Sequence, residues 1–598
     1  MPKDKEELKE KKSKEKKPDQ RGIKHWVSFG YNSSLIEKIK KIPGAYRSWD
    51  SNTKMWGFND RGWSLFCAIS EVQFKDEALA TDSDISYLPR KISNKLEDSI
   101  DWRKFYRPAN NKYDYDLNLW EFQKLGISRV IREKNCGLFY EMGLGKTYTT
   151  VCLAKELIDR KEISQCLVIS LVGGVLKQWA ELLDRMGYSY TIIKDQKMVD
   201  RPRTYKETDT DFVLTLYTSV LSKGQVGRAK KKKFSQVFRA KQEKSNQMIV
   251  ADELHKLGDV SSKTFKEFLM MAKSTKYRVP LTGTFIKSTP DKVLLPLRFI
   301  DPKTFSNKGV FEEAFMVKEE GKFGSKVVGY KNLSRLKELI HTYGMVALKE
   351  DHLKDLPELL PPKKIIVETS KDSREVLKSL RGDETLSLIQ RKADVDYAKL
   401  QDLYIRVHQA LICPHVFSDK FLAKNMLEAV ITILESIKGK TIIFTTLIEA
   451  VEEISNYLNK NSIKNVKCSG RYNDEQIDKN VNKFIADPEI NVMVATVQKM
   501  GTGYDKLKAA QNCIIYDFNM VAGDMLQAID RLHRSGQKNK VSVFELVQDN
   551  VISELQREKV QTQQNIINQT SDLKVKAKDS VDLTRLLKLA LESNLFKG

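Results

Sequence analysis

The chain has 598 residues, 41% hydrophobic and 30% charged, and a formal net charge of +23; this length predicts roughly three or four domains, and the charge favours a polyanion such as nucleic acid. Seven cysteines without a CxxC pair exclude a disulfide framework, and Cys413-Pro414-His415 offers too few donors for structural zinc. The longest apolar run, Cys166 to Leu176, is too short to span a bilayer, and the charged start is unlike a secretory signal. We therefore expect no membrane partner, and a soluble protein of the cytoplasm, nucleoid or nucleus.

Two different segments are predicted before the main body of the chain. Residues 1–21 predict a disordered charged tail, because lysine alternates with acid there and large aliphatic side chains are almost absent. Residues 22–92 predict a small αβ accessory module. Its expected parts are a strand at residues 26–29, a helix capped by Ser33 or Ser34, and a hairpin over residues 46–58.

Two tandem α/β lobes are predicted from short apolar strands that alternate with helical stretches, a pattern typical of parallel sheets flanked by helices. The first lobe is expected over residues 93–300, with strands near residues 138–139, 166–170, 212–216, 248–251 and 279–282. The second is expected over residues 425–555, with strands near residues 441–444, 465–468, 492–495, 513–516 and 541–546. Residues 301–424 predict a helical linker or protrusion, and residues 556–598 a C-terminal helical tail.

A phosphate-binding loop is predicted at residues 141–147, EMGLGKT, which follow a strand and precede a helix. Lys146 would neutralise the β and γ oxygens of ATP, and the hydroxyl of Thr147 would hold Mg²⁺. The strict loop pattern has Gly or Ala six residues before the lysine, where this chain has Tyr140. The backbone N–H groups expected to cradle the phosphates at the helix N-terminus are those of Gly143, Leu144 and Gly145.

A carboxylate pair ends a buried-type strand about a hundred residues later, in DELH at residues 252–255. Asp252 is predicted to bind Mg²⁺ through a coordinated water, and Glu253 to polarise the attacking water as general base. The alternative is an exposed acidic pair at a turn. The phosphate loop at a suitable distance upstream favours the catalytic interpretation.

Two arginines share one face of the helix predicted within QAIDRLHRSGQ at residues 527–537, because Arg531 and Arg534 are three positions apart. Guanidinium groups in this arrangement can stabilise the charge on a transferring phosphate, as arginine fingers from the opposite lobe. A solvated basic helix face is the alternative, but it gives the flanking Gln527 and Gln537 no role.

In this order and spacing, MGLGKT, DELH, LTGT (residues 281–284) and QAIDRLHRSGQ resemble motifs I, II, III and VI of the Swi2/Snf2 class of helicase superfamily two. The resemblance spans residues 119–537. It implies two RecA-like lobes, DNA-stimulated ATP hydrolysis with Mg²⁺, and translocation on double-stranded or forked DNA. It also implies that Gln123 reads adenine and that Gly503 touches the nucleotide.

The same resemblance implies roles for further residues. Those implied to contact nucleic acid are Trp179 in motif Ia, Thr218 and Ser219 in motif Ib, Thr445 in motif IV, and Thr496 and Lys499 in motif V. Those implied to couple hydrolysis to movement are His255, Thr282, Thr284 and Gln527, while Gln537 joins the catalytic set. Departures from the family pattern, expected to affect coupling rather than hydrolysis, stand at Tyr140, Phe285, Leu348-Lys349 and Asp505.

The N-terminal module resembles the HARP domain of annealing helicases, which implies action on forks, reannealing and displacement of bound proteins. Its Trp26, Trp49 and Trp56 either stack bases or form the module's own core. The basic run Lys223–Lys244 either holds phosphates or is a solvated insertion. Single-stranded DNA and replication or transcription proteins are further possible partners. Two alternative functions stay open: a translocase that acts on stalled polymerase, and a basic DNA-binding scaffold with a degenerate ATPase.

Overall fold

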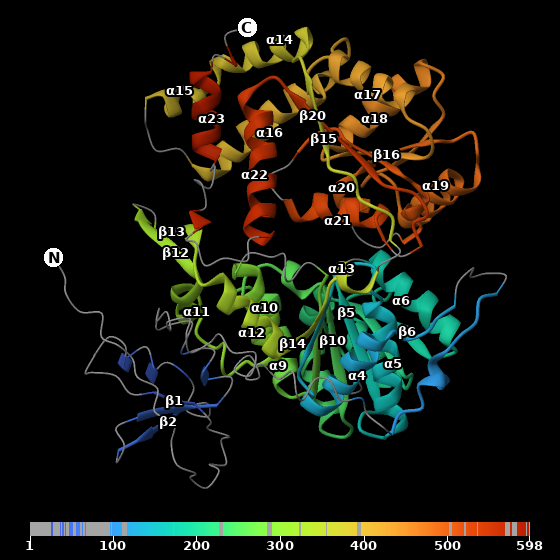
Figure 1. The fold of residues 1–598 in the computed structure, drawn as a ribbon, viewed down its shortest axis with the longest axis vertical. Coiled ribbons are helices and arrows are strands. Elements are labelled where there is room, and N and C mark those ends of the chain that lie inside the picture. Colours follow the sequence, from blue (N-terminus) through green and yellow to red (C-terminus); the bar gives the residue numbers. More distant parts are fainter. Residues whose placement is uncertain are drawn as a thin grey trace. The chain divides into compact units, whose positions relative to one another are not determined.

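The computed structural model (Figure 1) describes residues 25–27, 36–37, 39–40, 42, 47–51, 55–59, 62–63, 66, 96, 99–110, 116–171, 173–226, 231–283, 290–321, 324–353, 356–391, 396–500, 505–518, 522–534, 536–568, 575–576, 583–593 and 595–596. These residues fall into two compact units. The first is formed by the chain up to Lys349 together with β21 (Val575–Lys576), and the second by residues 350–568 together with α23 (Leu583–Glu592).

The first unit is built on a seven-stranded parallel sheet with the order β14-β4-β11-β10-β5-β7-β6. Helices cover both of its faces (Figure 1), as the alternating sequence predicts. The strands are β4 (Gly137–Tyr140), β5 (Gln165–Ser170), β6 (Tyr190–Ile192), β7 (Phe212–Leu216), β10 (Gln247–Asp252), β11 (Tyr277–Leu281) and β14 (Gly344–Ala347). The helices are α4 (Glu121–Glu133), α5 (Lys146–Asp159), α6 (Gly173–Met186), α7 (Arg201–Glu207), α8 (Phe234–Gln242), α9 (Lys263–Lys273), α10 (Pro290–Ile300), α11 (Lys308–Phe315) and α12 (Leu333–Tyr343).

Three neighbouring strands of this sheet position the predicted site. The order β4-β11-β10 places the phosphate loop, the LTGT segment and the DELH segment after adjacent parallel strands. Since parallel strands end at the same edge, the three segments meet at one edge of the sheet. Asp252 pairs with Leu281 at the last position of the β10–β11 register.

The second unit is built on a six-stranded parallel sheet with the order β15-β20-β19-β16-β18-β17. In β16 and β18, successive residues enter different apolar clusters, because side chains alternate between the two faces of a sheet: Ile443 and Val494 lie in one cluster, and Ile442 and Met493 lie in the other. The strands are β15 (Lys363–Val367), β16 (Thr441–Thr445), β17 (Asn465–Cys468), β18 (Val492–Thr496), β19 (Asn512–Ile515) and β20 (Ser542–Gln548). The helices are α14 (Lys371–Ser379), α15 (Glu384–Gln390), α16 (Tyr397–Ile412), α17 (Lys424–Ser436), α18 (Ile448–Lys460), α19 (Asp474–Ala486), α20 (Val497–Met500), α21 (Ala522–Leu532), α22 (Val551–Asn568) and α23.

The predicted α/β class with two parallel sheets is confirmed, and each strand expected in the two lobes is present. Residues 301–424, expected to be a helical linker, also contain strands. β12 (Met316–Gly321) and β13 (Gly324–Tyr330) form an antiparallel hairpin that β21 extends, while β14 and β15 are edge strands of the two main sheets. β14 and β15 are short and become strands by pairing with the edges of the main sheets, whereas β12 and β13 pair with each other inside a segment that is rich in charged residues.

The N-terminal module contains the antiparallel sheet β1-β3-β2, formed by β1 (His25–Val27), β2 (Arg47–Asp50) and β3 (Met55–Phe58). The predicted tail at residues 1–21 lies outside the described residues. None of the helices in the described part of the chain has both the length and the apolar character needed to cross a bilayer. The described cysteines are buried and free.

Candidate nucleotide and DNA site

The phosphate loop connects β4 to α5, whose first residue is Lys146. Gly143 and Gly145 have φ angles of +88° and +73°, in the left-handed region that favours glycine. A Cβ atom on Gly145 would also lie 2.4 Å from Nε2 of Gln123. Because Gly145 is the N-cap of α5 and has no side chain that could cap the helix, the N–H groups of the first turn can bind an anion.

The Lys146 ammonium lies over this loop. Its Nζ donates hydrogen bonds to the carbonyl oxygens of Tyr140, at 3.0 Å, and Glu141, at 3.5 Å. A Cβ atom on Gly283 would come within 2.8 Å of the same nitrogen, so the LTGT glycine permits the close approach. The structure therefore brings Lys146 beside the segment that carries motif III.

Gln123, which was predicted to read adenine, and Tyr140, which precedes the phosphate loop, are both buried beside that loop. Gln123 is 3% exposed, and its Nε2 donates to the carbonyl oxygen of Leu144 at 3.0 Å. Tyr140 is fully buried and packs edge-on against Phe122, in space left by the missing side chain of Gly126. The Tyr140 departure thus changes the core beneath α4, while its backbone carbonyl still contacts Lys146.

Asp252 ends β10 and is 6% exposed. Its Oδ2 accepts a hydrogen bond from the indole Nε1–H of Trp179 at 3.1 Å, and its backbone carbonyl accepts one from the Tyr217 hydroxyl at 3.2 Å. Trp179 is fully buried, so its indole is not placed to contact a duplex, unlike the role that the resemblance implies for it. Neither of these partners of Asp252 is evident from sequence spacing.

Glu253 has a left-handed backbone conformation, with φ +48° and ψ +41°, that is strained for a non-glycine residue. Its Oε2 lies 3.3 Å from Nδ1 of His255, and the same nitrogen lies 2.9 Å from the Thr282 hydroxyl. Burial lowers the pKa of His255 to about 4, so its imidazole is neutral near pH 7. The structure therefore joins the two predicted coupling residues, His255 and Thr282, directly.

The donor set of this edge fits MgATP. A cationic Lys146, a helix N-terminus and the Thr147 hydroxyl suit phosphate oxygens. Among the described residues, no cluster of three or more His, Cys, Asp or Glu side chains could hold a metal alone. Mg²⁺ commonly binds through one or two carboxylates together with substrate phosphates, and Asp252 with Thr147 fits that pattern.

The residues implied to contact nucleic acid differ in exposure. Thr218 is exposed in η5 (Tyr217–Leu221), and Lys499 is partly exposed in α20. Three others are buried: one lies within η5, and the other two are the last residues of β16 and β18. They are Ser219, Thr445 and Thr496. Ser219 accepts hydrogen bonds from Arg201, at 2.9 Å, and from Thr215, at 2.8 Å, which favours a structural role for its side chain.

Of the two predicted arginines in the second unit, Arg531 lies in the last turn of α21, whereas Arg534 lies two residues beyond its end, so the two do not share a helix face as the sequence predicted. Arg531 is 9% exposed and Arg534 is half-buried. Gln537 was predicted to be catalytic, but its Nε2 donates to the carbonyl oxygens of Lys508, Ala510 and Leu532, at 2.9–3.1 Å. Its Oε1 accepts the N–H groups of the two residues that follow it. Gln537 therefore fastens the loop after α21 to its own unit.

Two predicted site residues, Thr284 and Gly503, lie outside the described residues, as does the departure Phe285. Gln527 lies within α21, but its side chain is not among those described.

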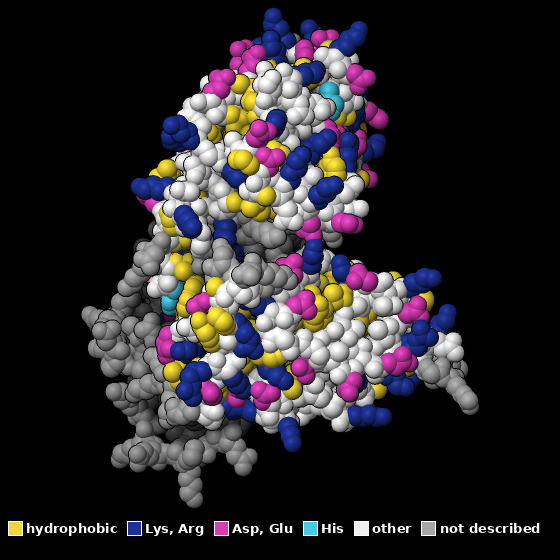
Figure 2. Space-filling model, turned by 90° about the vertical axis from the view of Figure 1, so that its right-hand side faces the viewer, with side chains coloured by type: hydrophobic (Ala, Val, Ile, Leu, Met, Phe, Trp, Pro, Cys, Tyr) yellow, Lys and Arg dark blue, Asp and Glu magenta, His cyan; other side chains and the backbone are white. Residues whose placement is uncertain are grey.

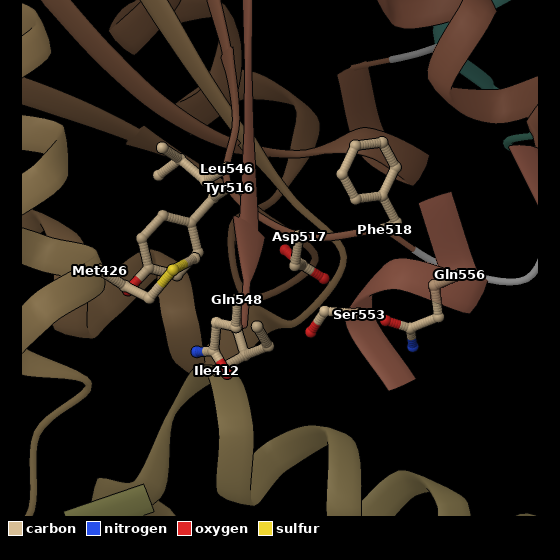
Figure 3. Close-up of a pocket in the computed structure, with 9 residues that line it drawn as sticks. All are labelled: Ile412, Met426, Tyr516, Asp517, Phe518, Leu546, Gln548, Ser553 and Gln556. Carbon is tan, nitrogen blue, oxygen red and sulfur yellow. The ribbon is translucent and has the colours of Figure 1, made fainter. Parts of the chain in front are cut away.

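A small cavity of about 10 Å³ in the second unit is lined by residues that include Tyr516, Asp517, Gln548 and Gln556 (Figure 3). It has room for about one water molecule, far less than a nucleotide needs. Burial acts to raise the pKa of Asp517, but hydrogen bonds from His408 and two threonines hold it below its usual value. Asp517 also accepts the backbone N–H of Thr446 at 2.9 Å, so this cavity belongs to a structural polar network.

The basic run has both structural and exposed members. Lys233 forms an ion pair with Glu267, and Lys241 donates to the carbonyl oxygen of Thr208 at 2.6 Å. Lys231 and Lys232 are exposed, beside and within β9 (Lys232–Lys233), which pairs with β8 (Lys223–Gly224). Figure 2 shows Lys and Arg side chains interspersed with Asp and Glu over one face of the molecule.

Comparisons with known proteins match most of the chain. A family model for the SNF2-related domain matches residues 47–416, and one for the helicase conserved C-terminal domain matches residues 424–536. A Caenorhabditis elegans homolog of SWI/SNF-related matrix-associated actin-dependent regulator of chromatin subfamily A-like protein 1 is 24% identical over 556 residues, covering 91% of this chain and 74% of its own. The Xenopus tropicalis protein of that name is 23% identical, covering 87% of this chain, which spans about half, 52%, of its length.

Among solved structures, a Sulfolobus solfataricus SWI2/SNF2 ATPase core in complex with dsDNA aligns with 82% of this chain and 98% of its own. Its TM-score is 0.34 and its sequence identity 20%.

Proposed function

The chain belongs to the SNF2-related family of helicase superfamily two ATPases, and we propose that it uses MgATP to translocate along double-stranded DNA. The observation that carries this proposal is the single sheet edge in the first unit where Lys146 follows β4 and where Asp252 and Glu253 stand at the end of β10, with β11 between the two strands. A degenerate ATPase in a DNA-binding scaffold would have no need to keep these three groups together.

We assign each group a role in hydrolysis. The first turn of α5, Lys146 and Thr147 bind the phosphates, and Asp252 orients the hydrated metal. Mg²⁺ would neutralise charge on the β and γ phosphates. Glu253 polarises the attacking water as general base. Arg531 and Arg534, which belong to the second unit, stabilise the charge that develops on the transferred phosphate as arginine fingers.

Duplex DNA is the proposed track. The net charge of +23 favours a polyanion. Thr218 and the exposed lysines of the β8–β9 hairpin offer hydroxyl and ammonium donors for phosphate oxygens. We expect the protein to reside with DNA, in a nucleus or nucleoid.

Forked DNA is the proposed preferred form. The C. elegans relative matches 91% of the chain. Within the module, Trp56 is 8% exposed and belongs to an apolar core cluster, whereas Trp49, opposite it in the β2–β3 register, is 47% exposed. The side chain of Trp26 is not among those described. The exposed Trp49 indole, whose ring centroid lies 5.0 Å from that of Trp56, is suited to stack on an unpaired base at a junction.

The motor proposal is tested by ATPase rate with and without blunt duplex. We expect duplex to stimulate hydrolysis in the wild type, and Glu253→Gln to lower the stimulated rate on the order of 100-fold or more while ATP still binds. A wild-type rate that no nucleic acid increases would contradict the proposal.

The fork proposal is tested by comparing ATPase stimulation by forked and blunt duplex. Trp49→Ala should lower stimulation by forks and leave stimulation by blunt duplex unchanged. Phe417→Ala, which removes a ring that is 38% exposed in the second unit, is the matched control. Equal stimulation of the wild type by forks and blunt ends would instead favour displacement of proteins, such as stalled polymerase, from unbranched DNA.

A further inference from the structure

Two aromatic side chains hold Asp252 from different segments of the first unit. Trp179 on α6 is fully buried and donates its indole N–H to Oδ2 of Asp252 at 3.1 Å. Tyr217, which begins η5, is 1% exposed and donates its hydroxyl to the backbone carbonyl of Asp252 at 3.2 Å. One bond therefore orients the carboxylate and the other fixes the backbone that carries it.

The hydrogen bond from Trp179 to the Asp252 carboxylate belongs to a class of strong hydrogen bonds, those with a charged acceptor. A buried indole N–H requires an acceptor, and an ionised carboxylate is a stronger acceptor than a neutral group. The packed ring of Trp179 cannot move without moving α6, because the indole is enclosed on all sides. The orientation of Asp252 is consequently linked to the position of α6.

Both segments also present residues to solvent. Lys177 is exposed on α6, two residues before Trp179, and Thr218 is exposed immediately after Tyr217. A ligand that contacts these exposed side chains and shifts α6 or η5 would therefore shift a direct partner of Asp252. The two segments connect a solvent-facing surface to the metal-binding carboxylate.

We propose that Trp179 and Tyr217 are positioning residues for Asp252, and that through them a duplex bound along α6 and η5 raises the affinity of the site for Mg²⁺. The duplex part rests on the proposed function, whereas the positioning of Asp252 does not require DNA. Hydrogen-bond partners of metal-binding side chains commonly change metal affinity by tenfold or more.

A merely structural role is the alternative, in which the two bonds only satisfy buried polar groups. Tyr205 supplies a matched control. It is fully buried, and its hydroxyl donates to Oε1 of Gln247 at 2.8 Å. Gln247 is the first residue of β10 and Asp252 is the last. Tyr205→Phe and Tyr217→Phe thus each remove one hydroxyl group that donates a hydrogen bond to β10, the first at the start of the strand and the second at its end.

The experiment measures Mn²⁺ binding, in place of Mg²⁺, by electron paramagnetic resonance with a non-hydrolysable ATP analogue present. Trp179→Phe keeps an aromatic ring but removes the N–H donor, and should weaken Mn²⁺ binding roughly tenfold. Tyr217→Phe should weaken it less, and Tyr205→Phe not at all. Two control affinities should remain within about twofold of wild type for all three variants, because neither involves a metal. One is the affinity for the ATP analogue in the presence of EDTA, and the other is the affinity for duplex in the absence of nucleotide.

The duplex part is read from the same titration with blunt duplex added. Duplex should tighten Mn²⁺ binding by the wild type and Tyr205→Phe, and this gain should be smaller in Trp179→Phe and Tyr217→Phe. A duplex that leaves wild-type Mn²⁺ affinity unchanged would overturn the coupling.

The positioning assignment has its own contrary outcomes. If Trp179→Phe or Tyr217→Phe binds Mn²⁺ with wild-type affinity, that residue does not position Asp252. If Tyr205→Phe loses as much Mn²⁺ affinity as these two variants, neither positioning role holds. Weakened duplex binding by Trp179→Phe would assign the indole to DNA contact instead. If Trp179→Phe fails to fold, Tyr217→Phe against Tyr205→Phe decides. Failure of the proposed function would appear separately, as an ATPase rate that DNA does not change.

Discussion

The Glu141 carboxylate accepts the backbone N–H of Lys349 at 2.6 Å, which ties the first residue of the phosphate loop to the last residue before the second unit begins. The N–H of Glu141 also donates to the carbonyl oxygen of Ala347, at 2.9 Å. We expect Glu141→Ala to destabilise the first unit by about 1–3 kcal/mol, since a buried N–H loses its acceptor, and to weaken ATP binding.

Urea unfolding and nucleotide titration measure these two effects. Glu141→Gln is the matched control, because its amide oxygen still accepts the N–H of Lys349. If the glutamine variant lost as much stability and affinity as the alanine variant, the negative charge of Glu141 would be the important property rather than its hydrogen bond.

We expect Gln537 to contribute to the stability of the second unit and not to the rate of ATP hydrolysis. Its amide makes hydrogen bonds to five backbone groups of the second unit. Gln537→Ala is expected to destabilise that unit by about 2 kcal/mol or more, with kcat close to wild type at a temperature where the variant is folded. Thermal unfolding and steady-state ATPase measure both effects; a large fall in kcat without a fall in Tm would restore the catalytic role predicted from the sequence.

Arg531 and Arg534 should act on hydrolysis and not on ATP binding. Replacing either with alanine is expected to lower DNA-stimulated kcat on the order of 1,000-fold if it serves as an arginine finger, with little change in nucleotide affinity. Arg374→Ala removes a half-exposed guanidinium paired with Glu368 in the same unit, and serves as the control. Unchanged kcat in both single variants would favour a solvated basic face.

His255 should make stability fall as the pH falls. Burial lowers the pKa of its imidazole from the ordinary 6.5 to about 4, so below pH 6.5 the unfolded chain binds a proton that the folded protein does not. The stabilising contribution of the neutral ring is therefore complete above pH 6.5, and about 3 kcal/mol of stability is lost as the pH falls to 4. Urea unfolding at several pH values should show a steeper loss for the wild type than for His255→Gln, and parallel curves would argue against this assignment.

The exposed lysines of the basic run should affect DNA binding. We expect Lys231→Ala with Lys232→Ala to lower the slope of log affinity for duplex against log salt by about 2, since each phosphate contact releases about one counterion. The paired control is Lys266→Ala with Lys273→Ala, two exposed lysines on α9. By contrast, Lys241→Ala should lower stability, because Lys241 bridges carbonyl groups inside the first unit.

The two parallel sheets and the order of the motifs could be predicted because their signals are local. Strands such as β5 and β10 are short apolar runs between helical stretches, and buried parallel strands have that composition. β14 and β15 could not be predicted, because their residues become strands only through pairing with β4 and β20. The burial of Ser219 and Thr445 was likewise not predictable, because it depends on which helices pack over the strand ends.

By itself, the sequence determined the phosphate loop. The left-handed Gly143 and Gly145 and a helix that begins at Lys146 are requirements of neighbouring residues in one turn of chain. Only the tertiary structure decided what holds the site in place. Trp179 meets Asp252 across 73 residues and Glu141 meets Lys349 across 208. Such hydrogen bonds depend on strand order and helix packing, so spacing along the chain contains no information about them.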